Sequence, residues 1–230
     1  METESQKYWH LRNHKLFWVL TNRQVKELCV VMRYKTAEKG DMIYFSEGAN
    51  NRIYILKKGF IKIAEIDDDG NENITDVIRK GDIFGELFFE NEDTEGRNEV
   101  AIAISNKVEI CSFTLEDFQL LLKQYPDVGL SFHKIIGWKF KKLKRRYSDL
   151  IFKSVKDRIR IFLEEWGRAE GEEKGDNWEI ENYLKQEDIA KLVCSTRQTT
   201  TSLLKELEKE GCIEYSRKKI IVHKRIVDNI

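Results

Sequence analysis

The chain has 230 residues, which is enough for two domains of ordinary size that each bury a core. Its 40 basic and 40 acidic residues cancel, so net charge gives no reason to expect a polyanionic or polycationic partner, and only the local charge distribution is informative. No apolar run approaches the roughly 20 residues of a membrane span, and the N-terminus lacks a signal peptide's apolar segment. We therefore expect a soluble, cytoplasmic protein that does not bind a membrane.

The first half of the chain begins with helical patterns and continues as strands. After a short helical opening, residues 22–32 carry apolar side chains at the helical period. Residues 36–114 consist of short runs rich in Ile, Val, Tyr and Phe that are separated by glycines, and Asp-Asp-Asp-Gly at 67–70 is typical of a hairpin turn. The pattern predicts a compact antiparallel barrel or sandwich over 36–114.

A long helix is predicted after the strands. A Thr-capped helical segment starts near residue 115, and Pro126 then lies where a first helical turn tolerates proline. Beyond it, apolar residues are spaced by four, seven, four and three positions, which is typical of a helix packed along a second helix in a dimer. These residues are Phe132, Ile136, Leu143, Tyr147 and Leu150. The alternative is one apolar stripe that lies on the barrel.

Local charge changes sign along the chain. Residues 65–95 hold twelve acidic and two basic residues, whereas residues 134–160 hold eleven basic and two acidic ones. This asymmetry indicates a partner for the second half. The basic run at 139–146 is either a solvated helix face or part of a phosphate-binding surface. A further helix is predicted over 154–166, and a Gly-rich acidic loop exposed to solvent is expected at 167–177.

The segment 186–211 combines two helical patterns with an unbroken polar run. Residues 186–193 and 197–210 predict two helices, which are separated by a break at 194–196 and ended by Gly211. Two helices joined in this way form a helix-turn-helix, whose second helix lies in the major groove of DNA. A strand, a basic turn at 216–219 and another strand follow, which predicts a wing that contacts phosphates. The alternative is a helical hairpin with a solvated face.

Polar side chains of this motif are the candidate DNA-binding residues. Arg197 can donate two hydrogen bonds to guanine, Gln198 can pair with adenine, and the hydroxyl groups can reach bases or phosphates. The full set is Gln186, Ser195, Thr196, Arg197, Gln198, Thr199, Thr201, Ser202, Lys205, Arg217 and Lys218.

Taken together, these motifs resemble a CRP/FNR-type transcription regulator over the whole chain. The likeness rests on GDMIYFSEG, RIYILKKGFIKI and KGDIFGEL in the first half, on the long helix, and on TRQTTTSLLKELEKEG in the second half. It implies an α+β fold with an N-terminal antiparallel β jelly-roll barrel like that of cyclic-nucleotide-binding domains (1–125), a long dimerisation helix (126–153) and a C-terminal winged helix-turn-helix (154–230). It also implies a homodimer on palindromic double-stranded DNA, contact with RNA polymerase, and allosteric coupling of an effector domain to DNA binding. Cys194 departs from the pattern, because many such motifs have glycine in the turn.

The resemblance also implies an effector site in the first half. In relatives that bind cyclic AMP, a Phe-Gly-Glu-Leu segment and an Arg followed by a small residue hold the nucleotide. The corresponding residues are Phe84, Gly85, Glu86, Leu87, Arg97 and Asn98, of which Asn98 departs from the family pattern. Two interpretations stay open: a site for a cyclic nucleotide or another small acid, or turn chemistry kept for folding after the ligand was lost.

The sequence predicts neither a metal site nor a catalytic group. The four cysteines are scattered and the four histidines are isolated, so they form no ligand set for zinc, an iron–sulfur cluster or haem. No nucleophile beside a base, no paired carboxylates and no phosphate-binding loop follow the barrel, so we do not expect an enzyme. The competing class is a cyclic-nucleotide-responsive signalling adaptor that binds protein through its C-terminal helices.

Overall fold

The computed structural model describes residues 4–45, 52–67, 69–85 and 98–227, and the chain divides into two compact units, residues 1–141 and 142–230. The division falls inside the long helix α4 (Pro126–Phe152). The three-part division at residues 125 and 153 therefore stays a prediction. Across the described ranges, every helix falls short of the apolar length that a membrane span requires.

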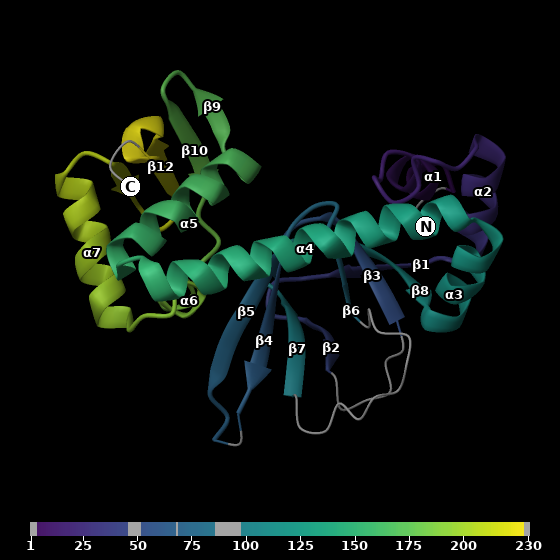
Figure 1. The fold of residues 1–230 in the computed structure, drawn as a ribbon, viewed down its shortest axis with the longest axis horizontal. Helices are drawn as coiled ribbons and strands as arrows, with labels where there is room; N and C mark the ends of the chain where they lie inside the picture. Colours follow the sequence, from purple (N-terminus) through teal and green to yellow (C-terminus); the bar gives the residue numbers. More distant parts are fainter. Residues whose placement is uncertain (1–3, 46–51, 68, 86–97, 228–230) are drawn as a thin grey trace. The chain divides into compact units, whose positions relative to one another are not determined.

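The first unit contains helices at its start and end with strands between them (Figure 1). Its elements before α4 are α1 (Glu4–Arg12), α2 (Asn22–Val31), β1 (Arg33–Ala37), β2 (Met42–Phe45), β3 (Arg52–Lys58), β4 (Ile61–Ile66), β5 (Glu72–Ile78), β6 (Ile83–Gly85), β7 (Asn98–Ala103), β8 (Val108–Thr114) and α3 (Leu115–Gln124). Local signals set several of these bounds. Thr21 and Gln24 form a capping box at α2, and the Thr114 hydroxyl caps α3.

The strands form two four-stranded antiparallel sheets. Their orders are β1-β8-β3-β6 and β2-β7-β4-β5, and Figure 1 shows the strands of the second sheet side by side. One apolar core takes side chains from both sheets, including Tyr54 of β3 and Ile63 of β4, so the sheets face each other across it. The predicted antiparallel jelly roll is confirmed. The hairpin expected at 67–70 is confirmed as well, since β4 and β5 pair on either side of it.

Strand β3 is buried on both of its faces. Tyr54 and Leu56 point into the core between the sheets, whereas Ile53 and Ile55 belong to a second core that also contains residues of α2 and α3. The two cores alternate along the strand because successive side chains point to opposite faces. The helices therefore cover the outer face of the first sheet, and a continuous apolar run in β3 is what such burial requires.

Phe132 on α4 belongs to this second core. Its side chain is 4% exposed, and its ring lies 5.2 Å from the ring of Phe118 in a T-shaped contact. The side chain already fills the core of its own unit, which argues against the assignment of Phe132 to a dimer interface; the other residues of that set stay a prediction. Ile136, one turn later, packs partly against the same core.

The second unit is a mixed helical and β domain. After the end of α4 it contains α5 (Val155–Glu170), β9 (Glu172–Lys174), β10 (Asn177–Glu181), α6 (Gln186–Leu192), α7 (Arg197–Lys209), β11 (Ile213–Tyr215), β12 (Lys219–His223) and the 3-10 helix η1 (Lys224–Val227). The strands form one sheet in the order β11-β12-β10-β9. Helix α5 packs on β10 and on α7. The predicted winged helix-turn-helix is confirmed, with a further hairpin before it.

The acidic loop expected at 167–177 is wrong. Helix α5 continues through Gly167 to Glu170, and the following residues form the β9–β10 hairpin. A Cβ atom at Gly167 would lie 2.8 Å from Cε3 of Trp178, and one at Gly171 would lie 2.7 Å from Cβ of the same residue. The two glycines make room for a buried indole, so their role is packing and not chain flexibility.

Candidate nucleic-acid interface

The turn between α6 and α7 is a tight, hydrogen-bonded break. Cys194 has φ 52°, which makes it the one residue other than glycine with a positive φ among those the structure describes. Its amide donates to the Lys191 carbonyl (3.1 Å), and the Ser195 amide donates to the Ala190 carbonyl (2.9 Å). A left-handed residue ends a helix in this way, and it costs a side chain such as that of cysteine about 1 kcal/mol. Glycine avoids this cost, which explains why it is common in such turns.

Helix α7 starts with a threonine cap. The Thr196 hydroxyl accepts a hydrogen bond from the Thr199 amide (3.1 Å), so one of the first free amides is satisfied within the chain. Arg197 and Gln198 follow on the exposed first turn, where the helix dipole is positive. This end of α7 therefore favours a negatively charged partner.

Four of the residues predicted to reach bases, all but Thr199, lie together with Lys205 on the outer face of α7. One shallow hollow is lined by Arg197, Gln198, Thr201, Ser202 and Lys205. The Thr201 hydroxyl donates to Oε1 of Gln186 (2.8 Å), which joins the first residue of α6 to this face. Thr200, which the sequence analysis left out of the candidate set, is fully buried.

Acidic side chains of α7 turn away from this face. Glu206 and Glu210 accept hydrogen bonds from Nζ of Lys156 on α5 (2.5 and 2.6 Å), and Glu210 also pairs with Arg160 (3.1 Å). These bonds lower the pKa of Glu210 and raise that of Lys156. Glu208 accepts a hydrogen bond from a backbone amide of β11. The acids of the helix are thus bonded within the unit, and cations remain on the outer face.

The wing presents two basic residues at its tip. Ser216 and Lys219 close the turn, since the Lys219 amide donates to the Ser216 hydroxyl (3.1 Å). Asn182 donates its side-chain amide to the Ser216 carbonyl (2.7 Å), which ties the turn to the rest of the unit. Arg217 and Lys218 between them are exposed. The structure therefore places both predicted wing residues where a phosphate backbone could reach them.

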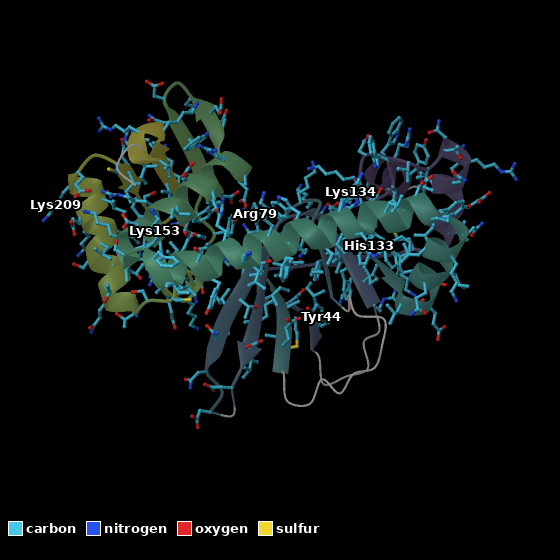
Figure 2. All side chains as sticks on the ribbon, in the orientation of Figure 1. Tyr44, Arg79, His133, Lys134, Lys153 and Lys209 are labelled. Atoms are coloured by element: carbon cyan, nitrogen blue, oxygen red, sulfur yellow. The ribbon has the colours of Figure 1, made fainter. Side chains whose placement is uncertain are left out.

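Lys209 is an exposed cation that the sequence analysis missed. It is the last residue of α7 and is labelled in Figure 2. Its spacing of four residues from Lys205 is the signal that could have identified it, because residues i and i+4 lie on one face of a helix.

One set of exposed apolar side chains forms a stripe along α4. Phe140, Leu143 and Tyr147 are 68, 63 and 65% exposed. With Ile136 and Leu150 they are spaced by four, three, four and three residues, which is the heptad pattern of paired helices. Phe140 was missing from the predicted set, although this regular spacing could have identified it.

Two of the candidate effector residues are explained by packing in the barrel. Phe84 is 3% exposed and stacks with Tyr54 (5.1 Å between ring centroids) and with Tyr44, which Figure 2 labels. Gly85 has φ +93°, and a Cβ atom there would lie 2.6 Å from the Arg52 carbonyl oxygen. The other four predicted residues cannot be placed: Glu86, Leu87, Arg97 and the side chain of Asn98 lie outside the described residues. In the part of the chain that the structure describes, no three His, Cys, Asp or Glu side chains gather as a metal site requires.

Comparison with known proteins supports both units. The model of the cyclic nucleotide-binding domain matches residues 34–125, and that of the Crp-like helix-turn-helix domain matches residues 157–225. The chain is 28% identical over 189 residues to the global nitrogen regulator of Synechocystis sp.. The aligned region covers 82% of this chain and 84% of that protein. It is 26% identical over 179 residues to the CRP-like cAMP-activated global transcriptional regulator of Mycobacterium tuberculosis, covering 77% and 79% of the two chains.

The fold is also found among solved structures. FixK2 from Bradyrhizobium japonicum superposes with a TM-score of 0.72 at 18% identity, covering 86% of this chain and 96% of that one. Both units of this chain, with their helix-turn-helix and jelly roll, are therefore accounted for by one family. The chain belongs to the CRP/FNR family of DNA-binding transcription regulators, whose members act as dimers.

Proposed function

We propose that the protein is a homodimeric regulator that reads a palindromic DNA site by placing α7 of each protomer in the major groove. The exposed face of α7 is the observation that carries this proposal, because it gathers cations, an amide and hydroxyls while the acids of the helix are bonded elsewhere. Arg197 and Gln198 contact base edges, and Thr201 and Ser202 contact bases or phosphates beside them.

The remaining candidate residues hold the protein on the phosphate backbone. Ser195, Thr196 and Thr199 surround the N-terminus of α7, where amide groups and the helix dipole attract anions. Gln186, Lys205 and Lys209 extend this contact along the motif. Arg217 and Lys218 bring the wing to a neighbouring phosphate.

The dimer forms along the apolar stripe of α4. Side chains at heptad spacing, exposed in the single chain, lose their contact with water when two such helices pack in parallel. Two copies of α7 then meet half-sites about one helical turn, or about 34 Å, apart. A two-fold axis between the protomers requires a palindromic site.

Selection from a pool of random duplexes by the purified protein tests this function. We expect enrichment of a palindrome whose half-sites lie roughly 10 base pairs apart. A pool that stays random with and without cyclic AMP contradicts the proposal and favours a signalling adaptor that binds protein through its C-terminal helices.

The partners of a regulator are part of the same proposal. We expect a cytoplasmic protein that changes the activity of RNA polymerase. Transcription in vitro from a promoter with the selected palindrome tests this expectation.

What the jelly roll binds is a separate question, because packing explains Phe84 and Gly85 without any ligand. Calorimetry with cyclic AMP and cyclic GMP decides it: heat at micromolar ligand indicates a retained site, and none favours turn chemistry kept for folding.

A further inference from the structure

Arg158 of α5 binds three backbone carbonyl groups from two separate segments. Its Nη1 donates to the Lys153 carbonyl (2.9 Å), Nε donates to the Val193 carbonyl (3.0 Å), and Nη2 donates to the Cys194 carbonyl (3.2 Å). Lys153, labelled in Figure 2, follows the last residue of α4. Val193 and Cys194 form the turn that precedes α7. All four residues belong to the second unit.

These carbonyls are ones that a helix leaves without an internal partner. The last four carbonyls of an α-helix lack intrahelical amides, and the negative end of the dipole lies there. Val193 is the C-cap of α6, and Lys153 directly follows α4. The guanidinium group thus joins the negative ends of two helices. Its planar fork of five N–H donors suits three acceptors at fixed positions, whereas the ammonium group of lysine is a compact charge.

The three hydrogen bonds of Arg158 also bridge the α4–α5 junction and the turn before α7. Only Lys153 and Ser154 separate α4 from α5. Helix α5 in turn bonds the far end of α7 through Lys156. Arg158 bonds the near end, through the turn before α7. The direction of α7 with respect to the end of α4 is therefore defined by bonds from a single helix.

We propose that Arg158 is a positioning residue that fixes α7 with respect to the end of α4 and so sets the half-site spacing that a dimer accepts. The inference rests on the proposed function, a dimer on a palindrome, and goes beyond it by naming the residue that determines spacing. Arg158 itself contacts no base in this arrangement. Without Arg158, α7 of each protomer stays folded but varies in direction with respect to α4. Binding both half-sites at once then has to fix these directions, which costs conformational entropy and weakens binding.

Arg158→Lys and Arg158→Met test this inference on three kinds of duplex. These are the selected palindrome, the same palindrome with one base pair added or removed at its centre, and a duplex with one half-site. We expect both variants to bind the palindrome roughly tenfold more weakly and to lose most of their discrimination between spacings. Affinity for the single half-site should stay within about twofold of wild type, because α7 is unchanged.

Arg168→Met is the matched control. Arg168 lies near the end of α5, is exposed, and pairs with Glu164 (2.6 Å), so its replacement removes the same charge from the same helix. We expect wild-type affinities on all three duplexes.

Two results overturn the inference. One is an equal loss of affinity for the half-site and for the palindrome, which would give Arg158 a role only in folding of the second unit. Failure of both variants to fold would lead to the same conclusion. The other is an unchanged spacing preference. If wild type itself binds palindrome and half-site equally well, the proposed function fails instead, so the two failures are distinguishable.

Discussion

At the scale of single residues, the candidate interface depends on exposed polar side chains of the first turns of α7. Arg197 stands on the first turn of α7, and the structure places it in the hollow with the other candidate base-reading residues. We expect Arg197→Ala to weaken binding to the selected site by about 1–3 kcal/mol, because a bidentate hydrogen bond to one base is lost. Binding to random duplex should change little. Fluorescence anisotropy titrations on both duplexes measure the difference.

Lys209→Ala provides the comparison for this prediction. A lysine that contacts only phosphate contributes equally to binding of every sequence. Its loss should therefore weaken binding to both duplexes alike and reduce the salt dependence of the affinity. If Arg197→Ala instead produced the same equal losses, its assignment to base reading would be refuted.

Single residues also mark the limit of what sequence can predict about exposure. Phe132 and Phe140 both fit a helical stripe, and nothing in the local sequence tells which of them the protein's own core covers. The answer depends on Phe118, which is distant in sequence and packs on Phe132. The three threonines at 199–201 differ for the same reason: only Thr200 faces inward.

At the scale of elements, helix α5 is longer than its sequence suggests because Gly167 within it and Gly171 at its C-cap make room for a packed side chain. Gly167→Ala should destabilise the second unit by about 1–3 kcal/mol, since the added methyl group meets the indole of Trp178. Gly137→Ala in α4 is the control of opposite sign, because a Cβ atom there meets nothing within 4 Å and alanine favours a helix by roughly 1 kcal/mol. Urea unfolding followed by tryptophan fluorescence gives both values. Equal effects of the two substitutions would contradict this role of Gly167.

The elements that could be predicted are those whose signals are local. The helix-turn-helix and its wing followed from two helical patterns, a break, a glycine stop and a basic turn, each of which is a signal read over a few residues. The β9–β10 hairpin did not, because glycine and acidic residues are also typical of loops. What makes this segment ordered is contact with Trp178 and pairing of β10 with β12, which only the folded chain brings together. The candidate DNA-binding surface was therefore predictable, and the contacts of Arg158 that hold it were not.

The N-terminal helical segment makes the stability of the first unit depend on pH. His14 accepts a hydrogen bond from the Leu16 amide at Nδ1 (3.2 Å) and donates from Nε2 to the Gly81 carbonyl (2.9 Å), an arrangement that only the neutral ring can make. Burial lowers the pKa of His14, and burial together with the neighbouring His14 lowers the pKa of His10 to about 4.

A lowered pKa in the folded state means that unfolding takes up protons once the pH falls below 6.5, the ordinary value for histidine. The contribution of each histidine to the free energy of unfolding is therefore fully present above that pH and is lost as the pH falls, for His10 down to about 4. The loss is at most about 1.4 kcal/mol per pH unit for each histidine. Urea unfolding between pH 7 and pH 5 should show this slope, and His10→Leu should reduce it. A slope that His10→Leu leaves unchanged would assign the dependence to other groups.

At the scale of the whole molecule, the proposed assembly depends on an apolar stripe that a single chain leaves exposed. Phe140→Glu places a charge at the centre of the stripe, where pairing of two helices would bury it, so we expect the variant to be monomeric. The monomer should keep its fold, because Phe140 is 68% exposed in the single chain. It should lose most of its affinity for the palindrome while it still binds a half-site.

Sedimentation equilibrium reports the molecular mass of Phe140→Glu directly. Trp138→Glu is the matched control, since Trp138 is 60% exposed on the other side of the same helix, two residues away. A dimer that survives Phe140→Glu but not Trp138→Glu would place the interface on the wrong face.

The left-handed residue in the turn before α7 also gives the protein a built-in probe. Cys29, Cys111 and Cys212 are buried, whereas Cys194 is exposed. A maleimide dye should consequently label one sulfur per chain, beside the proposed DNA-binding face. Its emission should then report DNA binding in real time without an engineered residue.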